Sequence, residues 1–84
     1  MAFTLRVSRK AQKNIDKLPE NYRLRVLQAL DVIEANPYFG KQLHGKHDGQ
    51  YSVRVWPYRI IYKIYKNELL VIVIAFGHRQ GAYK

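Results

Sequence analysis

The run from Tyr58 to Tyr65, which reads YRIIYKIY, constrains the fold more than any other part of the chain. Its density of aromatic and β-branched residues favours a β-strand. Because side chains alternate along a strand, two sets of four are expected on opposite faces: Tyr58, Ile60, Tyr62 and Ile64 on one, and Arg59, Ile61, Lys63 and Tyr65 on the other. Both faces are largely apolar, so we expect a central strand that is at least partly covered on both sides. Arg59 is the exception, and it is either a solvated arginine or one that faces an anion.

The first 35 residues predict a short strand followed by a helical hairpin. Phe3, Leu5 and Val7 alternate with polar residues, as in a strand with one buried face. Ser8 can cap a first helix over residues 9–18, and a second helix opens at residue 19 or 20 and runs to about Ala35. Apolar residues recur at helical spacing in both, so we expect one side of each helix to be buried and the basic residues to face solvent.

The remaining residues predict a three-stranded antiparallel meander. A strand over residues 51–55 turns at Pro57 into the central strand, and a polar turn at residues 66–68 leads into an apolar strand over residues 69–76, which Gly77 ends. Residues 36–50 are expected to form a loop that Leu43 anchors in the core. We therefore predict one α+β domain spanning residues 1–84, with the helices packed on one face of a small twisted sheet.

Composition narrows the functional classes. The 84 residues carry a net charge of +9 and no cysteine, which favours a polyanion or an acidic protein as partner and disfavours a disulfide-stapled secreted fold. No apolar run approaches the roughly 20 residues needed to span a bilayer, and the first residues lack a signal-peptide pattern, so we expect a cytoplasmic protein without membrane contact. His44 and His47 lie in the glycine-containing loop, where we interpret them as surface residues and expect neither metal nor cofactor.

Basic residues concentrate in the predicted sheet. From Tyr51 onward the chain has six Lys or Arg residues and one acidic residue. An antiparallel pair joined at Pro57 can bring Arg54 and Arg59 together on one sheet face, with Arg79 just past the end of the next strand. Like charges gathered in this way are easier to explain if an external anion completes the site. A generic basic surface is the alternative explanation.

Two further residues, His78 and Tyr83, are predicted to flank this cluster and suggest a chemistry. Metal-independent cleavage of RNA needs a base for the 2′-hydroxyl, cations that stabilise the phosphorane, and an acid for the leaving 5′-oxygen. Histidine, arginine and tyrosine can fill these roles. The alternative is that His78 and Tyr83 are exposed residues of a frayed tail.

The order of these elements, together with three motifs, resembles the RelE/ParE toxin superfamily of toxin–antitoxin modules over essentially the whole chain. The motifs are YSVRV at residues 51–55, YRIIY at residues 58–62, and Gly-His-Arg at residues 77–79 with a tyrosine four residues later. The resemblance implies that Arg59 and Arg79 contact phosphate and stabilise the transition state, and that Tyr83 stacks on or orients the scissile nucleotide. His78 occupies a position that varies across the superfamily and would be a supporting catalytic residue.

Resemblance to the RelE branch further implies an endoribonuclease that cuts mRNA in the ribosomal A site by 2′-hydroxyl attack, and that an acidic, partly disordered antitoxin neutralises. Arg54, Lys63 and Ser52 would contact the substrate, although RelE carries a lysine where this chain has Ser52. Two alternatives remain open. One is a ParE-like toxin that inhibits DNA gyrase without cutting RNA, and the other is a catalytically inactive, basic RNA-binding module.

Overall fold

The structure is a computed structural model that describes residues 2–45 and 49–78. Two helices, α1 (Arg9–Asp16) and α2 (Glu20–Ala35), follow the first strand, β1 (Thr4–Val7). Four further strands complete a five-stranded sheet: β2 (Lys41–Gln42), β3 (Gln50–Val55), β4 (Tyr58–Tyr65) and β5 (Leu70–His78). The strands lie in the order β1-β5-β4-β3-β2, and β1 runs parallel to β5 while the other pairs are antiparallel. The predicted α+β class and the β3-β4-β5 meander are confirmed.

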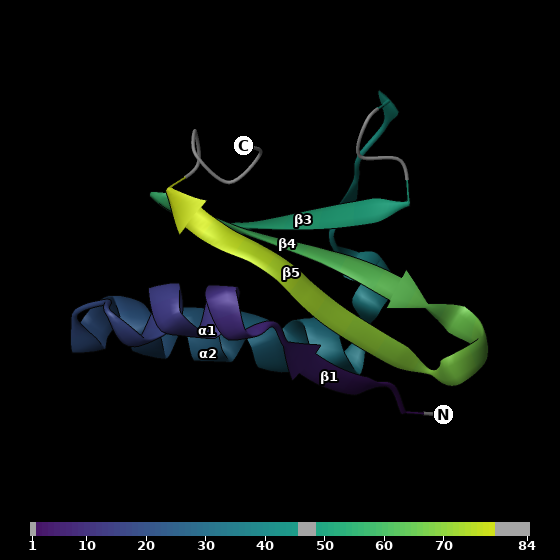
Figure 1. Ribbon diagram of the computed structural model, residues 1–84, viewed down its shortest axis with the longest axis horizontal. Helices are drawn as coiled ribbons and strands as arrows, with labels where there is room; N and C mark the ends of the chain where they lie inside the picture. The colour runs from purple at the N-terminus through teal and green to yellow at the C-terminus, as the bar shows by residue number, and fades with distance from the viewer. Residues whose placement is uncertain (1, 46–48, 79–84) are drawn as a thin grey trace.

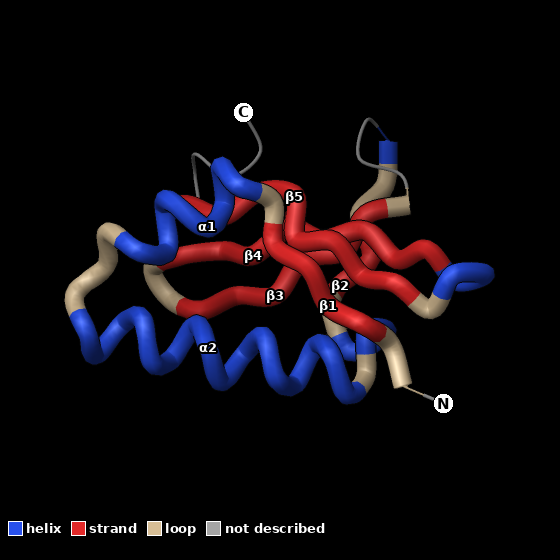
Figure 2. Tube along the Cα trace, turned by 60° about the horizontal axis from the view of Figure 1, so that its bottom comes forward, coloured by secondary structure: helices blue, strands red, loops and turns tan. Residues whose placement is uncertain are grey.

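Both helices cover the same face of the sheet. Figure 1 shows α1 and α2 on one side of the twisted strands, and Figure 2 shows α1 next to β5 and the longer α2 next to β3. The main core lies between these layers and takes residues from both helices and from the central strands. Its fully buried members include Ile15 of α1, Ile33 of α2 and Ile60 of β4. This arrangement leaves the other face of β3, β4 and β5 without a helix among the described residues.

Hydrogen bonds from the backbone and from side chains fix α1 against β5. The Ser8 hydroxyl oxygen caps the helix by accepting a hydrogen bond from the Ala11 N–H (3.2 Å), and the Ser8 N–H donates to the Val73 carbonyl (2.9 Å). Further along the helix, Asn14 Nδ2 donates to the Phe76 carbonyl oxygen (3.0 Å). Helix α1 ends at Asp16, two residues before the predicted end, and Pro19 is the N-cap of α2. Helix α1 is therefore held against β5 by hydrogen bonds from Ser8 and Asn14.

The segment between α2 and β3 has more structure than the predicted loop. A short 3₁₀ turn, η1 (Pro37–Phe39), is followed by β2, which pairs with β3 through Lys41–Ser52 and Gln42–Tyr51. Such a two-residue strand has no local pattern of its own and forms because β3 offers an edge to pair with. The prediction of a loop over residues 36–50 was wrong at β2, whereas the expected anchor, Leu43, is buried.

Tyr62 of β4 ties this segment to the core. Its hydroxyl donates to the Pro37 carbonyl oxygen (2.7 Å) and accepts from the Gly40 N–H (3.1 Å), and the side chain is fully buried. Burial disfavours the phenolate and raises the pKa of Tyr62 to about 12, although the hydrogen bond from Gly40 opposes the shift. Gly40 is required here by close approach, because a Cβ atom on it would overlap the Tyr62 hydroxyl.

A β-bulge in β5 decides which residues face the helices near its end. Ile61 pairs with Ala75 but Tyr62 pairs with Val73, so Ile74 is the extra residue. Val73 before the bulge and Phe76 after it both reach the main core, although they are three residues apart. Strand β5 then continues to His78, so the prediction that Gly77 ends the strand was wrong. Within the described part of the chain, no helix is both long enough and apolar enough to cross a membrane.

Candidate functional site

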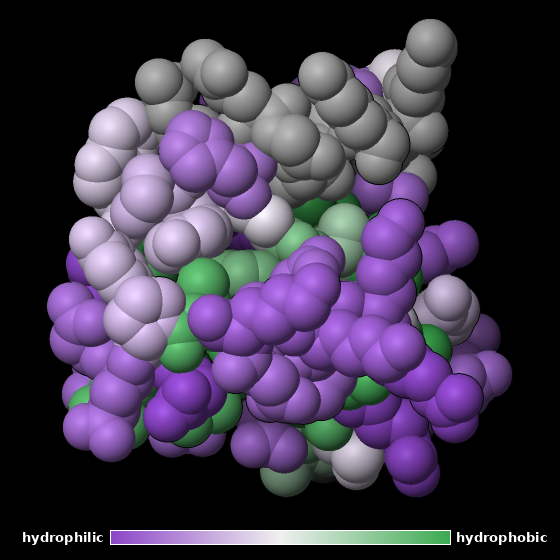
Figure 3. All heavy atoms as spheres, turned by 60° about the vertical axis from the view of Figure 1, so that its left-hand side comes forward, coloured by the Kyte–Doolittle hydropathy of each residue, from purple (hydrophilic) through white to green (hydrophobic). Residues whose placement is uncertain are grey.

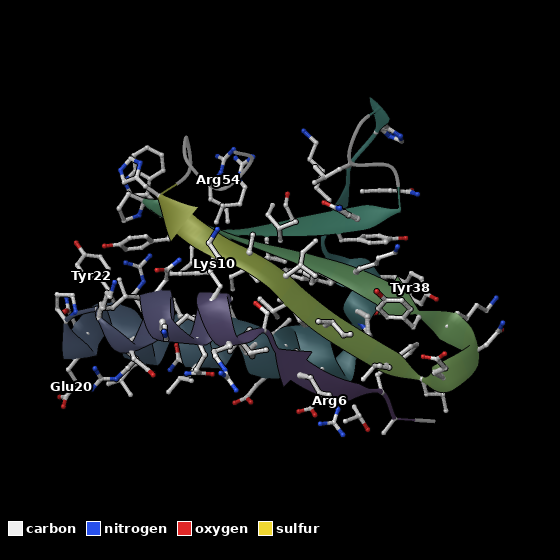
Figure 4. All side chains as sticks on the ribbon, in the orientation of Figure 1. Arg6, Lys10, Glu20, Tyr22, Tyr38 and Arg54 are labelled. Atoms are coloured by element: carbon white, nitrogen blue, oxygen red, sulfur yellow. The ribbon has the colours of Figure 1, made fainter. Side chains whose placement is uncertain are left out.

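Two arginines face each other on the sheet surface that the helices leave open. Arg54 of β3 pairs directly with Arg59 of β4, and Arg59 pairs in turn with Gly77 of β5. Directly opposed residues of an antiparallel ladder share one face, with Cα atoms roughly 4.5–5.5 Å apart. Figure 4 shows Arg54 on the side of the sheet away from α1 and α2. The predicted meeting of Arg54 and Arg59 is therefore confirmed.

These arginines line a hollow of about 290 Å³, together with Lys41 and Ser52. The volume is close to the lower limit of roughly 300 Å³ for small-molecule sites, so the hollow suits one small ligand group. Lys41 lies opposite Ser52 across the β2–β3 ladder, and Arg54 is two residues further along the same face of β3. Three of the four described lining residues are cationic and none is acidic. The hollow is therefore suited to an anion.

The strand pattern explains why the cations gather on this face. Val53 and Val55 of β3 and Ile60 of β4 point into the main core. Side chains alternate along a strand, so Arg54 and Arg59, their neighbours in sequence, must point away from the core. Direct apposition of two like charges destabilises a ladder by a few tenths to about 1 kcal/mol. An anion bound between the two arginines offsets this repulsion, because each guanidinium can donate two parallel hydrogen bonds to it.

An apolar cluster covers the neighbouring part of the same face. Leu43 and Ile61 are buried there, with Ile74 and Ala75 of the bulge packed against them. The bulge places both of its residues on this side, and Gly77 next to Arg59 adds no side chain. The cations are thus confined to the β2-β3-β4 end of the face, where Lys41 is a lining residue that sequence reasoning missed. Its only sequence signal is its charge, since its place depends on the long-range pairing of β2.

Ser52 and Lys63 lie at different distances from the hollow. Ser52 lines it and is only 5% exposed, and it is the one buried serine, threonine, amide or charged residue among those that the structure describes. Lys63 is exposed on the same face of β4 but pairs with Gln50, four residues along from Arg59. At 3.3 Å per residue the two Cα atoms are about 13 Å apart. Its Nζ atom lies 5.5 Å from the centre of the Tyr65 ring.

His78 lies on the opposite side of the sheet from the arginine pair. It pairs with Tyr58, and the two rings make an edge contact with centroids 6.3 Å apart. Regular alternation from Val71 and Val73 would place His78 on the Arg59 face, but the bulge reverses the phase. The expectation that His78 flanks the cluster was therefore wrong about its side. At the same end of the molecule, the ring of Tyr22 from α2 makes an edge contact with the ring of Tyr58, with centroids 5.6 Å apart.

Arg79 and Tyr83 lie outside the described residues, as does His47. Among the residues that the structure does describe, no three of His, Asp and Glu gather in a group that could hold a metal ion. Figure 3 views the end where α1 and α2 meet and shows hydrophilic atoms over much of the described surface, with narrow hydrophobic strips between them. The hollow is thus one part of a broadly polar, basic molecule.

Comparisons with solved structures place this fold in a class. A chain in the crystal structure of the RelBE2 toxin–antitoxin complex from Mycobacterium tuberculosis is similar at a TM-score of 0.83 and 27% identity, covering 94% of this chain and 93% of that one. A chain of the Escherichia coli RelBE complex has the same fold, at a TM-score of 0.80, 22% identity, and 92% and 96% coverage. The protein has the RelE-like fold.

Sequence comparison gives the family. Residues 5–83 match the family described as "ParE toxin of type II toxin-antitoxin system, parDE". The toxin RelG of M. tuberculosis is 28% identical over 86 residues, covering 100% of this chain and 99% of RelG. The chain therefore belongs to the ParE toxin family of type II toxin–antitoxin systems, within the RelE/ParE superfamily. The resemblance inferred from its motifs is confirmed.

Proposed function

We propose that this protein is an endoribonuclease toxin that cuts mRNA in the ribosomal A site. The observation that carries the proposal is the cross-strand pair of Arg54 and Arg59, which lines a hollow with no acidic residue among its described lining residues. A surface used only for docking has no need to pair two like charges at a cost in stability. A phosphodiester provides the anion that makes such a pair favourable.

The proposed reaction is attack by the ribose 2′-oxygen on the adjacent phosphorus. A 2′-O–P bond forms while the P–O5′ bond breaks, which leaves a 2′,3′-cyclic phosphate and a 5′-hydroxyl. One proton leaves the 2′-hydroxyl and one is delivered to the departing 5′-oxygen. Negative charge builds up on the non-bridging oxygens in the transition state, and a fixed guanidinium stabilises that charge. No metal is needed for these steps.

We assign roles to the residues on this basis. Arg59, which is partly buried, stabilises the phosphorane, and Arg54, which is exposed, grips the incoming phosphate with Lys41. Ser52 contributes a hydroxyl at the floor, and Lys63 contacts the RNA backbone further along. Arg79 and Tyr83 are proposed to complete the site as a second transition-state cation and as the residue that places the base or assists proton transfer. His78, on the far face, is proposed to support the site only indirectly.

A cell-free translation reaction with mapped mRNA cleavage tests this function. Arg59→Ala should lower the rate of A-site cleavage by about 100-fold or more, the cost of removing one transition-state donor. Lys66→Ala is the matched charge control, because Lys66 follows Tyr65, the last residue of β4, which is six residues from Arg59 and about 20 Å away at 3.3 Å per residue. Equal cleavage by wild type and Arg59→Ala, or no cleavage at all, would overturn the proposal.

The family match favours one second candidate, inhibition of DNA gyrase by the same fold acting as a binding platform. A gyrase supercoiling assay distinguishes the two functions, since an RNA-cleaving toxin leaves supercoiling unchanged. A third possibility, an inactive RNA-binding module, predicts binding without product. The logarithm of its binding constant would fall with the logarithm of salt concentration by a slope of about −0.7 for each phosphate neutralised.

The natural partner that we propose is a cognate antitoxin, as in the RelBE complexes that share this fold. The chain's charge of +9 favours an acidic segment that masks the hollow. Exposed apolar residues on α2, Leu24, Leu27 and Val32, offer surface that a segment folding on contact can cover. Co-expression with the adjacent reading frame should yield a stable complex and remove the growth arrest that the toxin alone causes.

A further inference from the structure

Helix α1 carries positive charge that the roles assigned above do not use. Residues 9–17 include four Lys or Arg residues and one acidic residue, whereas α2 has two Arg and three acidic residues. The two helices therefore differ in charge, and the positive one is the helix that packs against β5. Lys10, Lys13 and Lys17 are all exposed and, at 3.6 residues per turn, fall within about 60° of one another around the helix. We call these three residues the lysine stripe.

Helix stability does not account for Lys10. It lies in the first turn, where a cation opposes the helix dipole, and that turn has no acidic residue. Lys13 follows three residues later, a spacing at which like charges repel. The acidic residue of α1, Asp16, is a turn and a half further along and accepts a hydrogen bond from Gln12 (2.9 Å). A polyanion that lies along the stripe offsets both costs, because it is attracted to each lysine.

Helix α1 lies along β5 at the level of the arginine pair. Strand β1 pairs with β5 only as far as Val73, and α1 follows β1 along the rest of β5. The hydrogen bond from Asn14 Nδ2 to the Phe76 carbonyl oxygen (3.0 Å) fixes this position. The next residue of β5, Gly77, pairs with Arg59. Arg59 is therefore one strand spacing, about 4.8 Å, from the strand that α1 contacts.

The surface between the hollow and the stripe is open at Gly77. Because Gly77 pairs directly with Arg59, a side chain at this position would lie on the arginine side of the sheet, and a Cβ atom added there meets no described atom within 4 Å. Glycine within a strand often marks a place where a ligand approaches the backbone closely. Lys10 is one turn before Asn14 on the same side of α1, and Figure 4 shows its side chain extending from α1 towards the side of the sheet that carries Arg54. The hollow and the stripe thus lie on either side of an open glycine.

We infer that the lysine stripe binds backbone phosphates of the RNA on one side of the scissile step, so that the strand runs from the hollow across Gly77 to α1. This inference rests on the proposed nuclease function and extends its substrate site from the sheet to a helix. The stripe is about 10 Å long at 1.5 Å per residue, and its three lysines can neutralise up to three phosphates. Lysine binds phosphate as a point charge and does not read the base, so the stripe should raise affinity equally for all sequences.

The experiment measures RNA binding by fluorescence anisotropy at several salt concentrations. The full chain is titrated with a labelled 2′-O-methyl trinucleotide, which is long enough for the hollow alone, and with a 12-nucleotide single strand of mixed sequence, which can reach the stripe. The test variant is Lys10→Gln/Lys13→Gln/Lys17→Gln, because glutamine has nearly the helix propensity of lysine. For the longer RNA, the slope of log binding constant against log salt should fall by about 2, at roughly 0.7 per phosphate, and affinity at 0.1 M salt by up to about 100-fold. Binding of the trinucleotide should not change.

Two control variants separate the stripe from net charge. Arg6→Gln/Arg25→Gln/Lys66→Gln removes three exposed cations from β1, α2 and the turn after β4, so it has the same net charge as the test variant. It should lower the slope by less than the 0.7 that one phosphate contributes. Replacing the three lysines of the stripe by arginine keeps their charge and should keep the slope of the wild type. Circular dichroism and thermal midpoints confirm that each variant is folded.

The outcomes separate this inference from the proposed function. If the glutamine variant binds the longer RNA like wild type while Arg59→Ala weakens binding of both RNAs, the inference is wrong and the proposed function stands. If the charge-matched control loses as much affinity as the test variant, net charge is the cause and the inference is again wrong. If the stripe is needed for binding but wild type cuts no mRNA on the ribosome, the proposed nuclease fails while the RNA path stands. If wild type binds neither RNA, both fail.

Discussion

Substitution of Gly40 by alanine tests how the segment that carries Lys41 is fixed to the sheet. Gly40 has ordinary backbone angles (φ −70°, ψ 169°), so alanine causes no backbone strain and the effect comes from space alone. The new Cβ would overlap the Tyr62 hydroxyl and lie 2.9 Å from the Ser52 carbonyl oxygen. Because Tyr62 is fully buried, its ring has little room to retreat.

The magnitude follows from two costs. Overpacking a filled site costs about 1–3 kcal/mol, and each hydrogen bond of the Tyr62 hydroxyl that is lost adds about 1 kcal/mol. We expect Gly40→Ala to lower the free energy of unfolding by about 2–4 kcal/mol. That is a large part of the roughly 4–13 kcal/mol available to 84 residues at 0.05–0.15 kcal/mol per residue.

A double-mutant cycle in urea identifies the cause. Tyr62→Phe should cost about 1–3 kcal/mol by leaving the Pro37 carbonyl and Gly40 N–H without their partner. In that background Gly40→Ala should cost at least about 1 kcal/mol less than in wild type, because the overlapping hydroxyl is gone. Gly77→Ala is the matched control, since no described atom lies within 4 Å of its added Cβ. If the two effects are additive within about 0.5 kcal/mol, or if Gly40→Ala costs no more than Gly77→Ala, overlap with the Tyr62 hydroxyl is not the cause.

Two further predictions concern stability. The raised pKa of Tyr62, about 12 against 10 in the unfolded chain, means that the unfolded state loses this proton first. The stabilisation of the folded state that this pKa difference provides is fully present below pH 10. It is lost between pH 10 and 12, which lowers the free energy of unfolding by about 2–3 kcal/mol. Unfolding at a series of alkaline pH values should show a steeper fall for wild type than for Tyr62→Phe, and parallel curves would contradict the assignment. Ser8→Ala should cost about 0.5–2 kcal/mol by removing the α1 cap, whereas Ser8→Asp should retain most of the stability; equal thermal midpoints for all three proteins would argue against a capping role.

The sequence predicted the parts of the fold that repeat a local pattern. The period of two in YRIIYKIY assigned both faces of β4 correctly, because core residues must alternate with outward ones along a regular strand. The same logic paired Arg54 with Arg59, since a two-residue turn at Trp56 and Pro57 leaves little choice of register. Leu43 was also predicted as the anchor of the glycine-containing loop, and it is buried in the second cluster.

Features that depend on distant contacts could not be predicted in this way. Strand β2 exists only because β3 has an edge for it, so Lys41 gave no sign that it lines the hollow. The bulge at Ile74 lies in a uniformly apolar run, where polar and apolar residues do not alternate. The sequence therefore does not show that one residue is extra. It moves His78 to the helix side and places Gly77 beside Arg59. The sequence therefore predicted that Arg54 and Arg59 meet. It did not predict that Lys41 joins them or that His78 lies on the other face.

The proposed function depends on Arg54 and Arg59 holding one phosphate group between them. A crystal structure of the chain with an RNA trinucleotide, methylated at its 2′-oxygens to prevent attack, would show whether they do. We expect a single phosphate in the hollow, with oxygens about 3 Å from guanidinium nitrogens of both arginines. A trinucleotide bound on another surface, with the hollow holding no phosphate, would contradict it.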